Sequence, residues 1–127
     1  MKRLFMIMAL VFSLFILGGC KAPDKGDFVS VRVILHDGDK EVSNKVHEIA
    51  ENSSAFELLD EFYELLYDES SFGIFLNKVT IGSIMIEGSN ENQTFLAFYV
   101  NDVSSVVGVN DYYIKSDDVI MLKVEGW

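Results

Sequence analysis

The sequence contains only one cysteine, one proline and two histidines, and its basic residues are few. Because Cys20 is the only cysteine, an internal disulfide is excluded. The chain has 10 basic and 20 acidic residues and a net charge of −10. A charge of this sign repels nucleic acid and phosphate-rich substrates, because they are themselves anionic. We therefore expect no nucleic-acid partner.

Catalytic and metal-binding motifs are also missing. The sequence has no Gly-x-Ser-x-Gly turn to carry a nucleophile, and His47 has no second histidine or cysteine at ligand spacing. His36, Asp37 and Asp39 are ligand types, but Asp37-Gly38 is typical of a tight hairpin turn, and the spacing does not match a calcium loop. We expect no enzymatic activity, no metal site and no resident cofactor.

The first nineteen residues have the order of a secretory signal peptide. Lys2 and Arg3 precede an apolar run, 4–17, which is shorter than the ~20 residues that a membrane-spanning helix needs. The run ends in Leu17-Gly18-Gly19-Cys20, which resembles the bacterial lipoprotein lipobox, in which the cysteine is acylated and becomes the new N-terminus. The alternative is an uncleaved N-terminal anchor, which would tether the same domain outside the membrane.

The chain is therefore predicted to have three parts. Residues 1–19 are a signal peptide, residues 20–27 are a lipidated tether that contains the only proline, Pro23, and residues 28–127 are one domain. This length suffices for one hydrophobic core but not for two ordinary domains. We predict that the domain lies on the extracytoplasmic face of a bacterial cell membrane, anchored by lipid on Cys20.

The domain begins with a pattern that predicts a β-hairpin. Apolar residues alternate with polar ones from Phe28 to Leu35, as on a half-buried strand. Asp37-Gly38 follows as the turn, and 40–49 is the expected return strand. Later strands are predicted at 74–79, 83–87, 95–100 and 119–124.

A helix is predicted between the hairpin and the later strands. Ser54 and Glu57 have the spacing of a capping box, and apolar residues recur at helical spacing from Ala55 to Leu66. The helix should fray after about Tyr67, because Asp68 and Glu69 follow where the helix dipole favours cations. A hairpin, one helix and further strands predict an α+β fold, namely a β-grasp-like (ubiquitin-like) two-layer domain with one main helix packed on a mixed sheet.

Aromatic residues are numerous for so small a domain, with 10 phenylalanines and 5 tyrosines in the whole chain. One interpretation is that they fill the core. The other is that the surplus forms a surface for a ligand with a large apolar area. Under the second, the expected ligand contacts are Phe72, Phe75, Tyr99 and Tyr112.

Several segments resemble the transcobalamin-like C-terminal domain family, which would make the chain a bacterial lipoprotein member of a domain-of-unknown-function family. The resemblance covers about Val29 to Val124. It is carried by these segments: Phe95-Leu-Ala-Phe-Tyr-Val-Asn-Asp102, Val107-Gly-Val-Asn-Asp-Tyr-Tyr-Ile114, Ser116-Asp-Asp-Val-Ile120, Ser54-Ala-Phe-Glu-Leu-Leu59, and Phe72-Gly-Ile-Phe-Leu76 with Lys78-Val79. Asp102 and Asp117 stand where that family usually has glycine, but aspartate tolerates the left-handed conformation.

The resemblance implies a function as well as a β-grasp-like fold. Vertebrate members use this domain as the smaller lobe that covers cobalamin, and bacterial members look like surface lipoproteins, some of them associated with micronutrient uptake. We therefore expect a small-ligand-binding domain, with a corrinoid such as cobalamin as the candidate ligand and an uptake transporter or surface protein as the candidate partner. The alternative is a protein-interaction module that uses the acidic helix face, Glu57, Glu61 and Glu64, or a strand edge.

The lipid anchor can be tested on the protein purified from bacterial membranes. We expect intact-mass spectrometry to find a chain that begins at Cys20 and carries fatty acid, because acylation of this thiol is what holds an acidic domain at the membrane. A chain recovered from the cytosol with residues 1–19 intact and no fatty acid would contradict the prediction.

Overall fold

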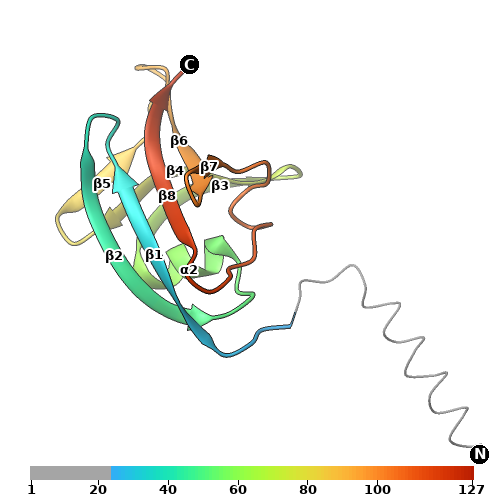
Figure 1. The fold of residues 1–127 in the computed structure, drawn as a ribbon. Coiled ribbons are helices and arrows are strands. Elements are labelled where there is room, and N and C mark those ends of the chain that lie inside the picture. The colour runs from blue at the N-terminus through green and yellow to red at the C-terminus, as the bar shows by residue number, and fades with distance from the viewer. Residues whose placement is uncertain (1–23) are drawn as a thin grey trace, which may run out of the picture.

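The computed structural model describes residues 24–127, so the predicted signal peptide and Cys20 lie outside the described residues (Figure 1). The division of the chain at residues 19 and 27 stays a prediction. The described part has eight strands and one helix, in this order: β1 (Phe28–His36), β2 (Glu41–Ala50), α2 (Ala55–Phe62), β3 (Glu64–Ser70), β4 (Gly73–Ile81), β5 (Ile84–Glu87), β6 (Thr94–Val100), β7 (Val103–Ser104) and β8 (Val119–Gly126). Within residues 24–127, no helix is long and apolar enough to cross a bilayer.

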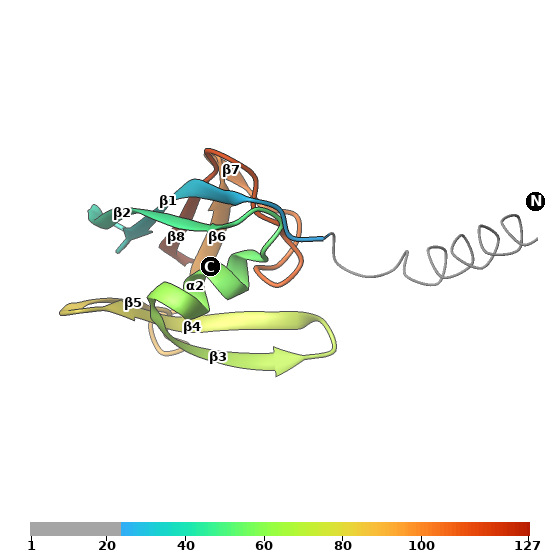
Figure 2. The same ribbon diagram turned by 90° about the horizontal axis from the view of Figure 1, so that it is seen from below.

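The strands form two separate sheets. The larger has the order β2-β1-β8-β6-β7, with β1 and β8 parallel and the other pairs antiparallel. The smaller has the order β3-β4-β5 and is antiparallel throughout. Figure 2 shows them as two layers, with α2 between them. The hydrophobic core therefore lies between two sheets, and the helix closes only part of it.

Alternation along the strands supplies this core. In β1, the side chains of Val31, Val33 and Leu35 are fully buried and face the small sheet, while Ser30 and Arg32 point to solvent. The other fully or almost fully buried strand residues are Val79, Ile86, Ile120 and Leu122. The predicted first hairpin and its facing are confirmed.

The β1–β2 turn confirms that Asp37 serves the backbone. Its carboxylate accepts hydrogen bonds from the backbone N–H groups of Asp39, at 2.8 Å, and Lys40, at 2.9 Å. These bonds, with Lys40 the larger cause, lower the pKa of Asp37 below its usual value. The two aspartates that stand where glycine was expected, Asp102 and Asp117, adopt φ values of +69° and +64°, so aspartate does take the left-handed conformation there.

The helix begins as predicted but ends early. Ser54 accepts a hydrogen bond from the backbone of Glu57, whose carboxylate accepts one from the backbone of Ser54. The expected extension to Tyr67 is wrong, because α2 ends at Phe62 and Tyr63 is extended, with φ −132° and ψ 158°. Residues 63–67 also alternate: Tyr63 is buried, Glu64 and Leu66 are exposed, and the segment pairs with β4.

The predicted β-grasp fold is therefore wrong. The segment expected to extend the helix pairs with β4, so the chain is mostly β, with one eight-residue helix and two sheets. The second sheet covers the core that a long helix was expected to cover. Leu66, which was expected in the buried helix face, is 58% exposed on the outer face of the small sheet.

Core packing predicts a sharp contrast between two leucines of the same segment. Leu59 is fully buried on α2, whereas Leu66 is largely exposed on β3. Leu59→Ala should lower the free energy of unfolding by about 2–5 kcal/mol, because it leaves a cavity. The matched variant Leu66→Ala should change it by less than about 1 kcal/mol. Urea denaturation followed by circular dichroism measures both, and equal losses would contradict the assigned helix end.

Candidate functional site

Two apolar side chains at one end of the molecule are almost entirely in solvent. Phe72 is 98% exposed and Val106 is 99% exposed. Phe72 lies at the tip of the β3–β4 hairpin, and Val106 lies in the long connection between β7 and β8. Both segments extend toward the same side in Figures 1 and 2. We call this the hairpin–loop end and define it as residues 68–73 together with residues 102–112.

Serine-closed turns present these side chains. In the hairpin, the Ser70 hydroxyl accepts a hydrogen bond from the backbone N–H of Phe72 at 3.1 Å. In the loop, the Ser105 hydroxyl accepts one from Val107 N–H at 3.2 Å and donates to Val107 O at 2.8 Å. A serine hydroxyl that binds the backbone two residues on stabilises a tight turn. Val106 lies inside the second of these turns, and Phe72 is the last residue of the first.

Asn110 joins the two segments. Its Oδ1 atom accepts a hydrogen bond from the backbone N–H of Ile74 at 3.3 Å. The side chain lies against Gly73, where an added Cβ would stand 3.0 Å from the same oxygen and the φ of +116° also favours glycine. The hairpin tip and the loop are therefore held together as one surface.

Asp118 holds the same loop through hydrogen bonds to its carboxylate. Its buried carboxylate accepts hydrogen bonds from the Tyr112 hydroxyl at 2.6 Å, the Lys115 N–H at 2.8 Å and Asn101 Nδ2 at 3.1 Å. Burial, followed by this bond to Asp118, raises the pKa of Tyr112 far above its ordinary value. The hydroxyl therefore stays protonated and keeps donating, which fixes the loop that carries Val106.

The structure brings two of the four predicted ligand-contact residues to the hairpin–loop end. Phe72 is at the tip, and Tyr112 is half-buried below the loop with its ring edge on Phe98, 6.2 Å between centroids. The other two predicted contacts lie elsewhere, because side chains alternate between the two faces of a strand. Phe75 is on the outer face of the small sheet, and Tyr99 is on the outer face of the large sheet, where its hydroxyl donates to Glu125.

Sequence reasoning missed Val106, Val107 and Asn110. A signal for the two valines was present, since Ser104-Ser105 before them and Gly108 after them are turn residues around an apolar pair. An apolar pair inside a turn has no strand face to occupy. Asn110 had no signal, because its partner, Ile74, is 36 residues away in the sequence.

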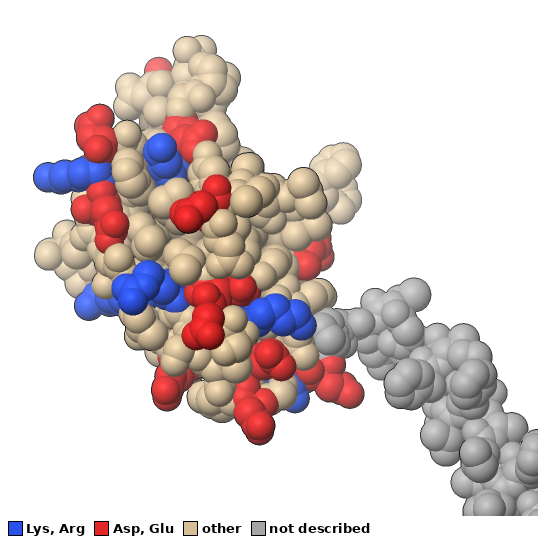
Figure 3. Space-filling model, viewed as in Figure 1, with Lys and Arg blue, Asp and Glu red and all other residues tan. Residues whose placement is uncertain are grey.

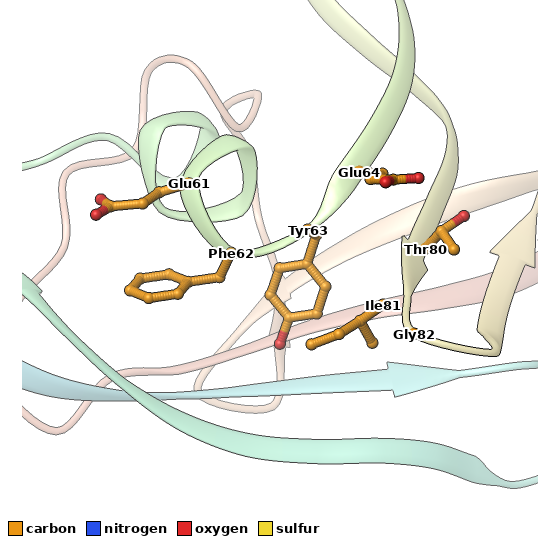
Figure 4. Close-up of a pocket in the computed structure, with 7 residues that line it drawn as sticks. All are labelled: Glu61, Phe62, Tyr63, Glu64, Thr80, Ile81 and Gly82. Carbon is orange, nitrogen blue, oxygen red and sulfur yellow. The ribbon is translucent and has the colours of Figure 1, made fainter.

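A pocket of about 340 Å³ opens where α2 meets the β4–β5 turn, and Figure 4 shows its seven lining residues: Glu61, Phe62, Tyr63, Glu64, Thr80, Ile81 and Gly82. The rings of Phe62 and Tyr63 and the side chain of Ile81 provide apolar surface. The carboxylates of Glu61 and Glu64 point in opposite directions (Figure 4). They therefore cannot converge on one cation, and this pocket lacks the paired acids of a metal or amine site.

His47 closes one side of this aromatic group. Its ring stacks on Phe62, with 4.2 Å between centroids, and its Nε2 atom is 2.8 Å from the Tyr63 hydroxyl oxygen. Burial raises the pKa of Tyr63 to about 12. Burial, with a smaller effect of Lys45, lowers the pKa of His47. Near neutral pH, His47 and Tyr63 are therefore both uncharged, and their rings contribute to packing.

A second pocket, also about 340 Å³, lies on the acidic face of α2 and is lined by Lys25, Phe28, Ile49, Ala50, Ser53, Glu57, Asp60 and Glu61. Lys25 Nζ lies 2.5 Å from a carboxylate oxygen of Glu57, and this bond is the main cause that lowers the Glu57 pKa. Part of the acidic helix face is thus already paired with the chain's own cation.

The strand edges carry features that oppose pairing with another chain. On edge strand β2, Lys45 is opposite Val33 and so shares the core-facing side of the sheet. An inward-facing charge discourages the addition of a further strand. Edge strand β3 has a register shift between Leu66 and Tyr67, which distorts that edge in the same sense.

Acidic side chains are spread over the face seen in Figure 3 and gather at its lower edge, while the basic ones are scattered among them. Within residues 24–127, no group of three or more His, Cys, Asp and Glu side chains could hold a metal ion. Carboxylates are therefore abundant, but in the described part of the chain they do not form a coordination site.

Comparisons with known proteins give a family for the chain and structures of similar fold. The family model described as Domain of unknown function (DUF4430) matches residues 52–126. A search of curated proteins finds no significant match to the sequence. Two solved structures share the fold. A candidate metal-binding protein from Ruminococcus gnavus ATCC 29149 has a TM-score of 0.57 at 14% identity, over 80% of this chain and 98% of that one.

The second structure is haptocorrin in complex with Cbi. Its TM-score is 0.66 at 9% identity, and the match covers 86% of this chain. The chain spans only 28% of haptocorrin's length. At these identities the likeness shows the fold alone.

The uncharged state of His47 predicts a pH dependence of stability. The pKa of His47 in the folded protein lies below the ordinary histidine value of about 6.5. The stability from the neutral ring is therefore complete above that value and is lost as pH falls through the folded pKa. His47→Gln should therefore reduce the drop in Tm between about pH 7.5 and 5. His36→Gln, in the β1–β2 hairpin, is the control that should keep the drop. Equal drops in both variants would contradict the assignment.

Proposed function

The chain belongs to the DUF4430 family, and from this premise we propose that residues 28–127 form an extracytoplasmic domain that binds a small ligand of the corrinoid class. The proposed anchor is lipid on Cys20, and the proposed role is capture of the ligand for an uptake transporter or another surface protein. This reading assigns the domain no catalytic step and no resident cofactor.

The fold supports the class of ligand. The chain has the fold of part of haptocorrin, which was solved with Cbi bound, and cobinamide, abbreviated Cbi, is a corrinoid. Together with the sequence segments described above, this likeness supports a relationship to the transcobalamin-like C-terminal domains. The TM-score to haptocorrin is also higher than that to the candidate metal-binding protein, 0.66 against 0.57.

The single observation that carries the proposal is the exposure of Phe72 and Val106 on one pre-formed surface. When a ligand covers an apolar side chain that stands alone in water, the complex is stabilised by about 1.5–3 kcal/mol for each side chain. Asn110 and Asp118 hold the two segments in place before any ligand arrives. Less conformational freedom is then lost on binding, and more of that gain remains as affinity.

The same arithmetic limits the affinity of this domain alone. Covering two such side chains supplies about 3–6 kcal/mol before the costs of association. Dissociation constants near 1 mM and 1 μM correspond to about 4 and 8 kcal/mol. Even before those costs, about 3–6 kcal/mol corresponds to dissociation constants from several millimolar to tens of micromolar, so we expect binding by this domain alone to be no tighter than the high micromolar range. The rest of the haptocorrin chain has no counterpart in the match, so a further protein surface would have to cover the ligand for tight binding.

The alternative function, a protein-docking module, has less support. Its acidic helix face is partly neutralised, because Lys25 pairs with Glu57. Its candidate edge, β2, carries the inward-facing Lys45, which discourages strand addition.

The proposal is tested by titrating the mature, detergent-solubilised protein with cobinamide and following heat and absorbance. Phe72→Ala should weaken binding about tenfold, which corresponds to about 1.4 kcal/mol. Phe75→Ala is the matched control, because Phe75 is also exposed, at 54%, but on the outer face of the small sheet. It should leave the affinity unchanged. No heat or spectral change at millimolar cobinamide would rule out the function.

A further inference from the structure

The hairpin–loop end carries charge of one sign only. Its two segments, 68–73 and 102–112, contain the acidic residues Asp68, Glu69, Asp102 and Asp111 and have no lysine, arginine or histidine. All four acidic residues are solvent-exposed. A ligand that covers Phe72 and Val106 therefore meets acidic side chains and no basic ones from these two segments.

Two of these acidic residues, Asp102 and Asp111, belong to the loop, and hydrogen bonds or turns of the backbone hold their positions. Asp102 occupies the left-handed turn, φ +69°, directly before Val103, which is itself 67% exposed. Asp111 follows Asn110, and its N–H donates to Gly108 O at 3.0 Å. In the sequence, Asp102 and Asp111 therefore flank the exposed valines of a loop that is held by Asp118.

Cations of the described chain do not neutralise these acidic side chains. Lys115 is the first basic residue after the loop segment, and its Nζ atom lies 2.5 Å from Asn52 Oδ1, at the start of the helix region. On the hairpin, Asn77 Nδ2 donates to Asp68 at 2.9 Å, which orients that carboxylate without neutralising it. The apolar surface thus has an acidic rim without a basic counterpart in its own segments.

We propose that this rim selects corrinoids by charge, so that the hairpin–loop end prefers cationic corrinoids to uncharged ones of the same shape. The inference deepens the proposed function and rests on it. Cobinamide is cationic when water occupies both axial positions of the cobalt and uncharged when cyanide does. Cobalamin adds a phosphodiester, whose negative charge the rim repels. The apolar side chains supply most of the affinity, and the carboxylates supply the discrimination.

The test compares one ring system in two charge states. The mature protein is titrated with diaquacobinamide and with dicyanocobinamide at about 50 mM and about 500 mM salt, because added salt shortens the range of surface charges. We expect the cationic form to bind about fivefold to tenfold more tightly at low salt. This preference should shrink toward unity at high salt.

Variants then assign the preference to the rim. Asp102→Asn combined with Asp111→Asn should abolish most of the preference while leaving the affinity for dicyanocobinamide unchanged. Asp39→Asn combined with Glu41→Gln is the matched control, since it removes the same formal charge at the β1–β2 turn, on the opposite side of the molecule from the hairpin tip (Figures 1 and 2). This control should keep the preference.

The outcomes separate the two proposals. Equal affinity for both forms at low salt would overturn charge selection and leave corrinoid binding standing. A preference that persists at high salt would also overturn it, because that result indicates replacement of an axial water by a protein ligand on cobalt. Absence of binding by either form would overturn the proposed function, and charge selection with it.

Discussion

The burial of one face of each sheet against the other is the constraint on which the rest of this structure depends. Val31, Val33 and Leu35 on β1 face Val79 and the rest of the small sheet, and all of them are fully buried. This interior excludes water over most of the length of the strands. It leaves the hairpin tips and the long β7–β8 connection outside, where they are free to carry function.

Rigidity at the hairpin–loop end comes from polar bonds as well as from Val109, which is buried in the core. Asn110 bonds the loop to the start of β4, and Asp118 receives three donors from the same region. Hydrogen bonds to a buried carboxylate are among the stronger ones in proteins. The exposed Phe72 and Val106 are thus displayed on a fixed frame. A fixed apolar surface that the fold leaves uncovered is the feature that best explains a ligand-binding role.

Two groups of aromatic residues have different roles in the structure. At the helix end, His47, Phe62 and Tyr63 contact one another and stay uncharged near neutral pH, so they pack the molecule. At the hairpin–loop end, Phe72 has no such partner among the described residues. Aromatic composition alone could not separate these duties, because both groups come from similar stretches of sequence. Only the loss of contact at one end makes a surface available.

By itself, the sequence determined the features that depend on neighbouring residues: the faces of β1, the turn at Asp37, the capping box at Ser54 and the left-handed aspartates. Tertiary structure decided the rest. Residues 63–67 satisfy both a helical and an alternating pattern, and pairing with β4 selected the strand. The same long-range contacts placed Phe72 with Tyr112, sent Phe75 and Tyr99 to other faces, and exposed Val106. A local pattern cannot encode these outcomes, because the partners lie outside it: Leu65 pairs with Val79, Tyr99 bonds Glu125, and Asn110 bonds Ile74, 36 residues away.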